Sequence, residues 1–78
     1  MNLVVALSEL GKARRFVRDG RKCMIRQRRI VEHLERRGHD AFEAIQFLEC
    51  LEEMQQGYIA HRNRLKQHVL VLVKPEEE

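Results

Sequence analysis

Apolar residues return at seven-residue intervals along both halves of the chain. In the first half, a line with alternating steps of four and three residues runs through Phe16, Gly20, Cys23, Gln27, Ile30 and Leu34. A second line of period seven lies beside it, at Leu10, Val17, Met24 and Val31. The second half repeats the pattern at Ala44, Leu51, Tyr58, Leu65 and Leu72. Heptad spacing is typical of helices that pack lengthwise, so we predict long helices over about 8–37 and 40–72.

The residues around Gly38 mark the break between these helices. Arg36 and Arg37 occupy the predicted last turn, where the helix dipole favours cations, and Gly38 can adopt the left-handed conformation that closes a helix. Asp40 is predicted to cap the next helix, with Glu43 completing a capping box. A turn over 38–40 is short, and short connections join antiparallel neighbours. The pattern therefore predicts a helical hairpin in a single domain over 1–78.

Folding the chain at the predicted turn places Gly20 opposite Tyr58 and Gln27 opposite Leu51, with Gly57 at the level of Gly20. Each glycine inside a helix costs about 1 kcal/mol relative to alanine. Two at one level indicate either a close approach of the helices or a weak point that divides the fold into three or four shorter helices. Gln27 is predicted on the seam, where a buried polar group pins the register. The alternative is that it lies at the seam edge and reaches water.

The two predicted helices carry more apolar surface than one packing partner can cover. A lone hairpin would leave much of it in water, which monomers avoid, whereas pairing two hairpins into a four-helix bundle would bury it. We therefore expect an all-α fold, an antiparallel helical hairpin that forms a homodimer; the alternative is a different protein partner for the same surface. The expected interface residues are Phe16, Val17, Cys23, Met24, Ile30, Val31, Leu34, Phe47, Leu48, Leu51, Met54, Tyr58 and Leu65.

The two ends of the chain are rich in valine and leucine, which suits strands as well as helices. Residues 2–7 and 68–73 meet at the open end of the hairpin, where they would pair as a short ribbon, continue the helices or clasp a partner. Ser8 is predicted to cap the first helix. Pro75 stops regular structure, and residues 74–78 are expected to form a solvated acidic tail.

Charge is sorted along the chain beneath a net charge of +3. Residues 12–37 hold eleven basic and three acidic side chains, whereas residues 40–56 hold five acidic and no basic ones. We favour an arrangement in which the basic arm lies against the acidic arm and fixes its orientation. The alternative is a face that binds phosphate or an acidic partner, although it lacks interleaved aromatics. That face would consist of Arg14, Arg15, Arg18, Arg21, Lys22, Arg26, Arg28 and Arg29.

Composition and motif content argue against several classes of protein. No apolar run approaches the roughly 18 residues of a membrane-spanning helix. The N-terminus lacks a basic segment, so we expect no signal peptide and a cytoplasmic protein with two reduced cysteines. There is no glycine-rich phosphate loop, C-x-x-C or H-E-x-x-H, and the four histidines are scattered. We therefore predict no catalytic, cofactor-binding or metal-binding residues and no enzyme activity.

Part of the chain carries a recognisable series of short motifs. They are Arg26-Gln27-Arg28, Leu34-Glu35, Gly38-His39-Asp40, Glu43-Ala44, Leu51-Glu52-Glu53 and His61-Arg62-x-Arg64-Leu65. This pattern resembles a group of short uncharacterised bacterial proteins, over roughly residues 16–65. The resemblance implies a helical hairpin of coiled-coil character with no assigned activity.

The sequence thus favours a non-enzymatic protein-interaction or regulatory module that acts through self-association and partner binding. Its working surfaces would be the apolar seams and the basic arm of residues 12–37. The alternative function is that of a nucleic-acid-binding accessory protein that uses this arm.

Overall fold

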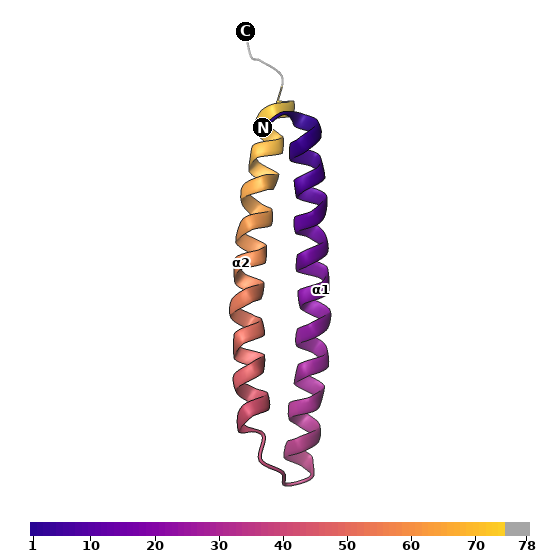
Figure 1. Ribbon diagram of the computed structural model, residues 1–78, viewed down its shortest axis with the longest axis vertical. Coiled ribbons are helices and arrows are strands. Elements are labelled where there is room, and N and C mark those ends of the chain that lie inside the picture. The colour runs from indigo at the N-terminus through magenta and orange to yellow at the C-terminus, as the bar shows by residue number, and fades with distance from the viewer. Residues whose placement is uncertain (75–78) are drawn as a thin grey trace.

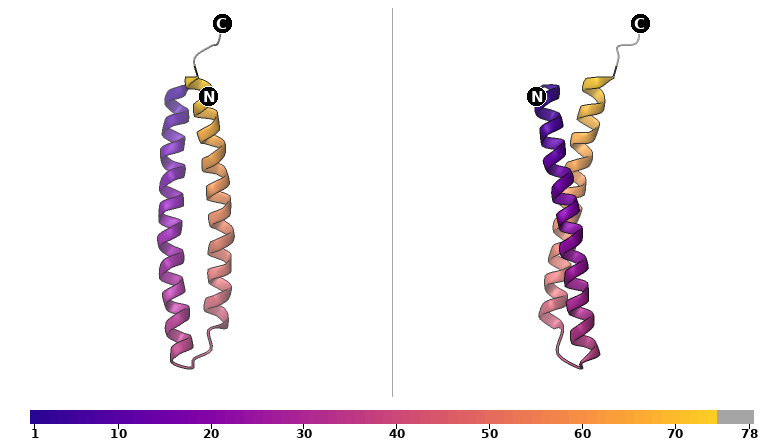
Figure 2. Two further views of the ribbon diagram at one scale, coloured as in Figure 1. Left: turned by 180° about the vertical axis from the view of Figure 1, so that it is seen from behind. Right: turned by 90° about the vertical axis from the view of Figure 1, so that its right-hand side faces the viewer.

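Two long helices form an antiparallel hairpin in the computed structural model, which describes residues 1–74 (Figure 1). Helix α1 spans Leu3–Arg36 and helix α2 spans Phe42–Val73. With 34 and 32 residues, each is about 50 Å long. The helices lie side by side in one view and cross at a shallow angle in another (Figure 2). The predicted all-α hairpin is confirmed, and both valine-rich ends are helical; the predicted acidic tail beyond residue 74 lies outside the described residues.

Helix α1 begins five residues before its predicted start. The Asn2 side chain caps the helix, because its Oδ1 atom accepts a hydrogen bond of 2.9 Å from the Val5 backbone N–H. Asparagine is as good an N-cap as serine. Ser8 lies inside the helix, so its predicted capping role is wrong. The apolar pattern extends through Ala6, which is completely buried, and this burial supports the additional turn.

The end of α1 forms as predicted around Gly38. This glycine has a φ of 68°, the left-handed conformation that an L side chain adopts only at a cost. The His39 N–H donates to the Leu34 carbonyl at 2.9 Å, and the Gly38 N–H donates to the Glu35 carbonyl at 3.1 Å. These two hydrogen bonds make a Schellman motif, which satisfies carbonyl groups that the helix end would otherwise leave unpaired.

Helix α2 begins two residues later than predicted, so residues 37–41 connect the helices rather than 38–40. Ala41 occupies the N-cap position, one residue after the predicted Asp40, and its side chain makes no capping hydrogen bond. The Asp40 Oδ1 atom instead accepts a hydrogen bond of 2.9 Å from the N–H of Phe42, the first residue of α2. The part of the chain that is described shows no return hydrogen bond from Glu43 to the Asp40 backbone. The predicted capping box between Asp40 and Glu43 is therefore wrong, because Asp40 bonds to Phe42 and the N-cap is Ala41.

The seam between the helices combines the second line of the sequence pattern with the Gly20 and Gln27 steps of the first line. The α1 residues that are buried on the seam are Ala6, Leu10, Ala13, Val17, Gln27 and Val31. Phe16 and Ile30, by contrast, are 56% and 43% exposed, and Cys23 is also exposed. The small side chains of Ala6, Ala13 and Gly20 explain this choice, because they let the helices approach closely. Phe16, Cys23 and Ile30 therefore border the seam and are not buried in it, while their role in an intermolecular interface stays a prediction.

The remaining expected interface residues divide between the seam and its border. Leu65 is buried on α2, with Leu10 and Ala13 packed around it and Val69 beside them. The side chains that are partly buried are Met24, Leu34, Leu48, Leu51 and Tyr58. Phe47 and Met54 on α2 are 56% and 50% exposed. The hairpin core is accordingly narrow, and several large apolar side chains lie outside it.

Two glutamines tie the helices together across the seam. Gln27 is buried and its Nε2 atom donates to the Ala44 carbonyl at 3.0 Å, two turns nearer the loop than the predicted position opposite Leu51. Gln55, which the heptad analysis did not single out, is buried and donates from Nε2 to the Val17 carbonyl at 2.8 Å. These bonds fix the longitudinal position of one helix against the other.

Both helices run without a break through their mid-helix glycines. Gly20 lies against Tyr58, as predicted, and a Cβ atom placed there would also overlap the Gln55 carboxamide. Gly57 has no neighbour within 4 Å of its would-be Cβ atom. Gly20 therefore serves close helix approach, and Gly57 does not share that role.

Candidate interaction surfaces

One side of the hairpin carries an apolar surface that runs along both helices. We call it the apolar flank and define it as Phe16, Cys23, Ile30, Phe47, Leu51, Met54 and Tyr58. A shallow cleft of about 150 Å³ lies within it, lined by Phe16, Asp19, Gly20, Cys23, Leu51, Met54 and Tyr58. Ile30 and Phe47 each lie seven residues from a member of this lining, on the same helix faces, and extend the flank toward the loop.

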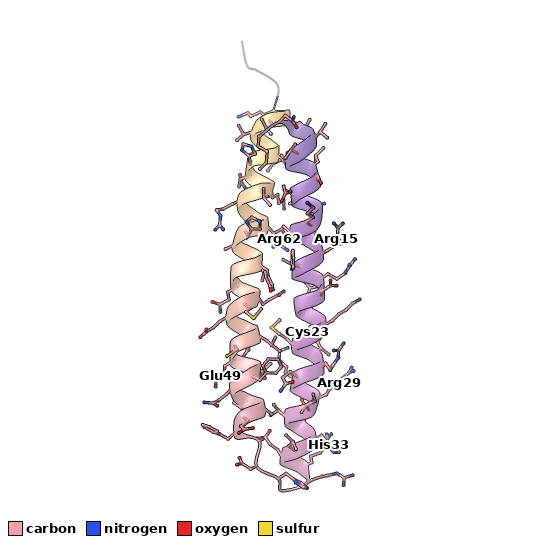
Figure 3. All side chains as sticks on the ribbon, in the orientation of Figure 1. Arg15, Cys23, Arg29, His33, Glu49 and Arg62 are labelled. Carbon is pink, nitrogen blue, oxygen red and sulfur yellow. The ribbon has the colours of Figure 1, made fainter. Side chains whose placement is uncertain are left out.

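The side chains of the flank are apolar but only partly covered. Phe16 and Tyr58 stack across the two helices, with ring centroids 5.4 Å apart and ring planes inclined by 26°. Phe16, Phe47 and Met54 remain about half exposed. Cys23 points from α1 toward α2, whereas Arg29 and Glu49 point outward from their helices (Figure 3). The flank therefore presents a partly exposed apolar surface that spans both helices.

The opposite side of the seam carries a second, strongly basic cleft. We call it the basic cleft and define it as Arg14, Arg18, Arg21, Arg62 and Lys66. It has a volume of about 360 Å³, and Val17 is the remaining residue in its lining. Three cations come from successive turns of α1 and two from the facing turns of α2, and no carboxylate of the described residues contributes to the lining.

The structure splits the basic face predicted from the sequence. Of the eight predicted residues, only Arg14, Arg18 and Arg21 line the basic cleft. Arg28 forms an ion pair with Glu52, at 3.7 Å from Nη2 to Oε2. The residues that lie elsewhere on exposed positions of α1 are Arg15, Lys22, Arg26 and Arg29. The predicted packing of basic against acidic arm is thus represented by a single cross-helix ion pair within residues 1–74.

Arg62 and Lys66 were missed because the predicted face was confined to one helix. The signal that would find them is the register, since folding at Gly38 brings residues near 62 beside residues near 16. Arg62 is half-buried in this position, and its guanidinium donates to the neighbouring Asn63 Oδ1 atom at 3.0 Å.

Other candidate chemistry is sparse in the described part of the chain. Cys23 and Cys50 are both free thiols on exposed positions. Cys23 is therefore not the buried seam residue that the heptad pattern suggested. Within residues 1–74, no three histidine, cysteine, aspartate or glutamate side chains gather closely enough to hold a metal ion. Neither of the two helices described is both long and apolar enough to cross a membrane.

Comparison of the chain with known protein families, with curated proteins and with solved structures found no match. The helical hairpin that the motif resemblance implies is present, but no family is shown for the chain. Functional inference therefore depends on the two surfaces themselves.

Proposed function

We propose that the protein is a non-enzymatic interaction module that self-associates through its apolar flank, with two hairpins forming a four-helix bundle. The observation that carries this proposal is the half-exposed state of Phe16, Phe47 and Met54 along one continuous side of the molecule. Burying a large apolar side chain completely contributes about 1.5–3 kcal/mol, and roughly half of that is still available at each of these positions.

The narrow core of the hairpin supports the same proposal. Among the described residues, only seven hydrophobic side chains and two glutamines are buried, and no large side chain is fully buried. Chains of this size are marginally stable as monomers because they bury only about 60% of their unfolded surface. A second hairpin against the flank would complete the core.

The dimensions and charge of the hairpin favour a second copy as the occupant. The hairpin measures 66 × 17 × 16 Å along its principal axes. The area of one long side therefore exceeds the roughly 800 Å² that each partner buries in a standard interface. A twofold interface uses the same surface on both copies. If α1 of one copy lies beside α2 of the other, the basic residues of 12–37 approach the acidic residues of 40–56 in the partner.

The exposed thiol of Cys23 offers a direct test, since it lies within the flank. In a Cys50→Ser chain, Cys23 is the single thiol, and its alkylation rate can be measured from micromolar to millimolar protein. We expect the rate to fall as the concentration rises, because association covers the flank. The matched control combines Cys23→Ser, Cys50→Ser and Lys22→Cys, which places the single thiol on the outer side of α1. The alkylation rate of this control should not change with protein concentration. The proposal would be ruled out if the alkylation rates of the two thiols depended on protein concentration in the same way.

A further inference from the structure

We infer that the basic cleft binds the phosphate backbone of a nucleic-acid duplex, independently of self-association. The cleft brings together Arg14, Arg18 and Arg21 of α1 with Arg62 and Lys66 of α2, and none of the acidic side chains within residues 1–74 lines it. Neither helix alone presents this cluster, so the site depends on the folded hairpin.

The charges of the cleft are largely uncompensated within residues 1–74. Arg14, Arg21 and Lys66 form no ion pair there. Arg18 is paired with the adjacent Asp19 at 3.3 Å, in an exposed geometry that contributes little. Like charges held across a helix interface repel one another, so an anion in the cleft would relieve that repulsion and stabilise the hairpin.

The chemistry of the lining favours backbone phosphates over bases. The cleft contains no aromatic side chain, whereas single-stranded nucleic acids are bound largely by stacking bases on aromatic rings. Phe16 and Tyr58, which could stack, lie on the opposite side of the seam. Arginine and lysine contacts to phosphate are the sequence-independent part of duplex binding.

The spacing of the cations along α1 suits a duplex backbone. Arg14 and Arg21 are two helical turns apart, about 10 Å along α1. This distance corresponds to the rise of about three nucleotides along one strand of a duplex. Because the apolar flank lies on the other side of the seam, the basic cleft stays accessible in the proposed dimer.

Fluorescence anisotropy of a labelled 20-base-pair DNA duplex between 50 and 200 mM KCl tests the inference. Five phosphate contacts predict an affinity loss of roughly 500-fold over this range. The Arg14→Gln, Arg21→Gln, Lys66→Gln variant keeps two phosphate contacts. Its loss of affinity between 50 and 200 mM KCl should therefore be only about tenfold. The control, Arg15→Gln, Lys22→Gln, Arg29→Gln, removes the same charge from exposed positions outside the cleft and should keep the steep dependence. Circular dichroism at each condition establishes that both variants are helical.

Several outcomes would overturn the inference. One is that the two triple variants lose affinity equally, which would indicate diffuse attraction to a basic surface. Another is that the wild-type protein does not bind the duplex at 50 mM KCl. A third is equal or tighter binding to polyglutamate, or to vesicles of phosphatidylglycerol, at matched ionic strength. None of these results bears on the alkylation of Cys23, so the two proposals fail separately.

Discussion

At the scale of single residues, the contact between Gly20 and Gln55 decides how closely the helices approach. The Gln55 carboxamide occupies the space that a side chain at Gly20 would need. Its Nε2 atom is held by the Val17 carbonyl, while its Oε1 atom is buried without a hydrogen-bond partner. A buried polar atom without a partner is costly, so the carboxamide fixes one arrangement of the helices at some expense in stability.

Alanine substitutions at the two mid-helix glycines should therefore differ. Both gain about 1 kcal/mol of helix propensity. The new methyl group of Gly57→Ala meets no neighbour, so this variant should keep the gain. The new methyl group of Gly20→Ala overlaps the Gln55 side chain, and such overpacking should cost about 1–3 kcal/mol of unfolding free energy. Urea unfolding should place Gly57→Ala about 2 kcal/mol above Gly20→Ala. Equal stability of the two variants would show that the helices do not meet at Gly20.

At the scale of the elements, the sequence predicts the loop end of the hairpin better than the open end. Gly38 and Asp40 carry local signals that depend only on their neighbours. Gly38 closes α1 as predicted, and Asp40 bonds to the first residue of α2, although Ala41 is the N-cap. The start of α1 was misplaced because Asn2 and Ser8 are equally suitable caps. The choice depends on the burial of Ala6 against the facing helix, which a local pattern does not contain.

Substitutions at the turn test its construction. Gly38→Ala forces an L side chain into a φ of 68° and should cost about 1–2 kcal/mol of unfolding free energy. Asp40→Ala removes the hydrogen bond to the Phe42 N–H and should cost about 0.5–1.5 kcal/mol. Arg37→Ala, at a φ of −88°, is the control and should change stability by less than about 0.5 kcal/mol. A Gly38→Ala variant as stable as this control would contradict the left-handed turn.

At the scale of the whole molecule, two apolar lines compete for the seam of α1. Phe16, Cys23 and Ile30 precede Val17, Met24 and Val31 by one residue, or about 100° around the helix. Both lines repeat every seven residues, so periodicity alone leaves the choice open. The small residues Ala6, Ala13 and Gly20 decide it through close packing. The basic cleft escaped prediction for a related reason, because its cations come from two helices.

The proposed function depends on apolar residues of α1 that lie outside the seam, namely Phe16, Cys23 and Ile30. Side chains that the sequence assigned to the hairpin seam instead form the apolar flank, and the hairpin is left with a narrow core. The central claim is that a second copy covers this flank.

Sedimentation equilibrium of the full chain over a wide concentration range tests that claim most directly. We expect a mass that rises to twice the 9.3 kDa of one chain. We also expect that Met54→Glu on the flank shifts the equilibrium to monomer, while Ile25→Glu, an exposed apolar position outside the flank, leaves the dimer intact. A folded wild-type protein that remains at 9.3 kDa up to millimolar concentration, or a dimer equally insensitive to both substitutions, would contradict the claim.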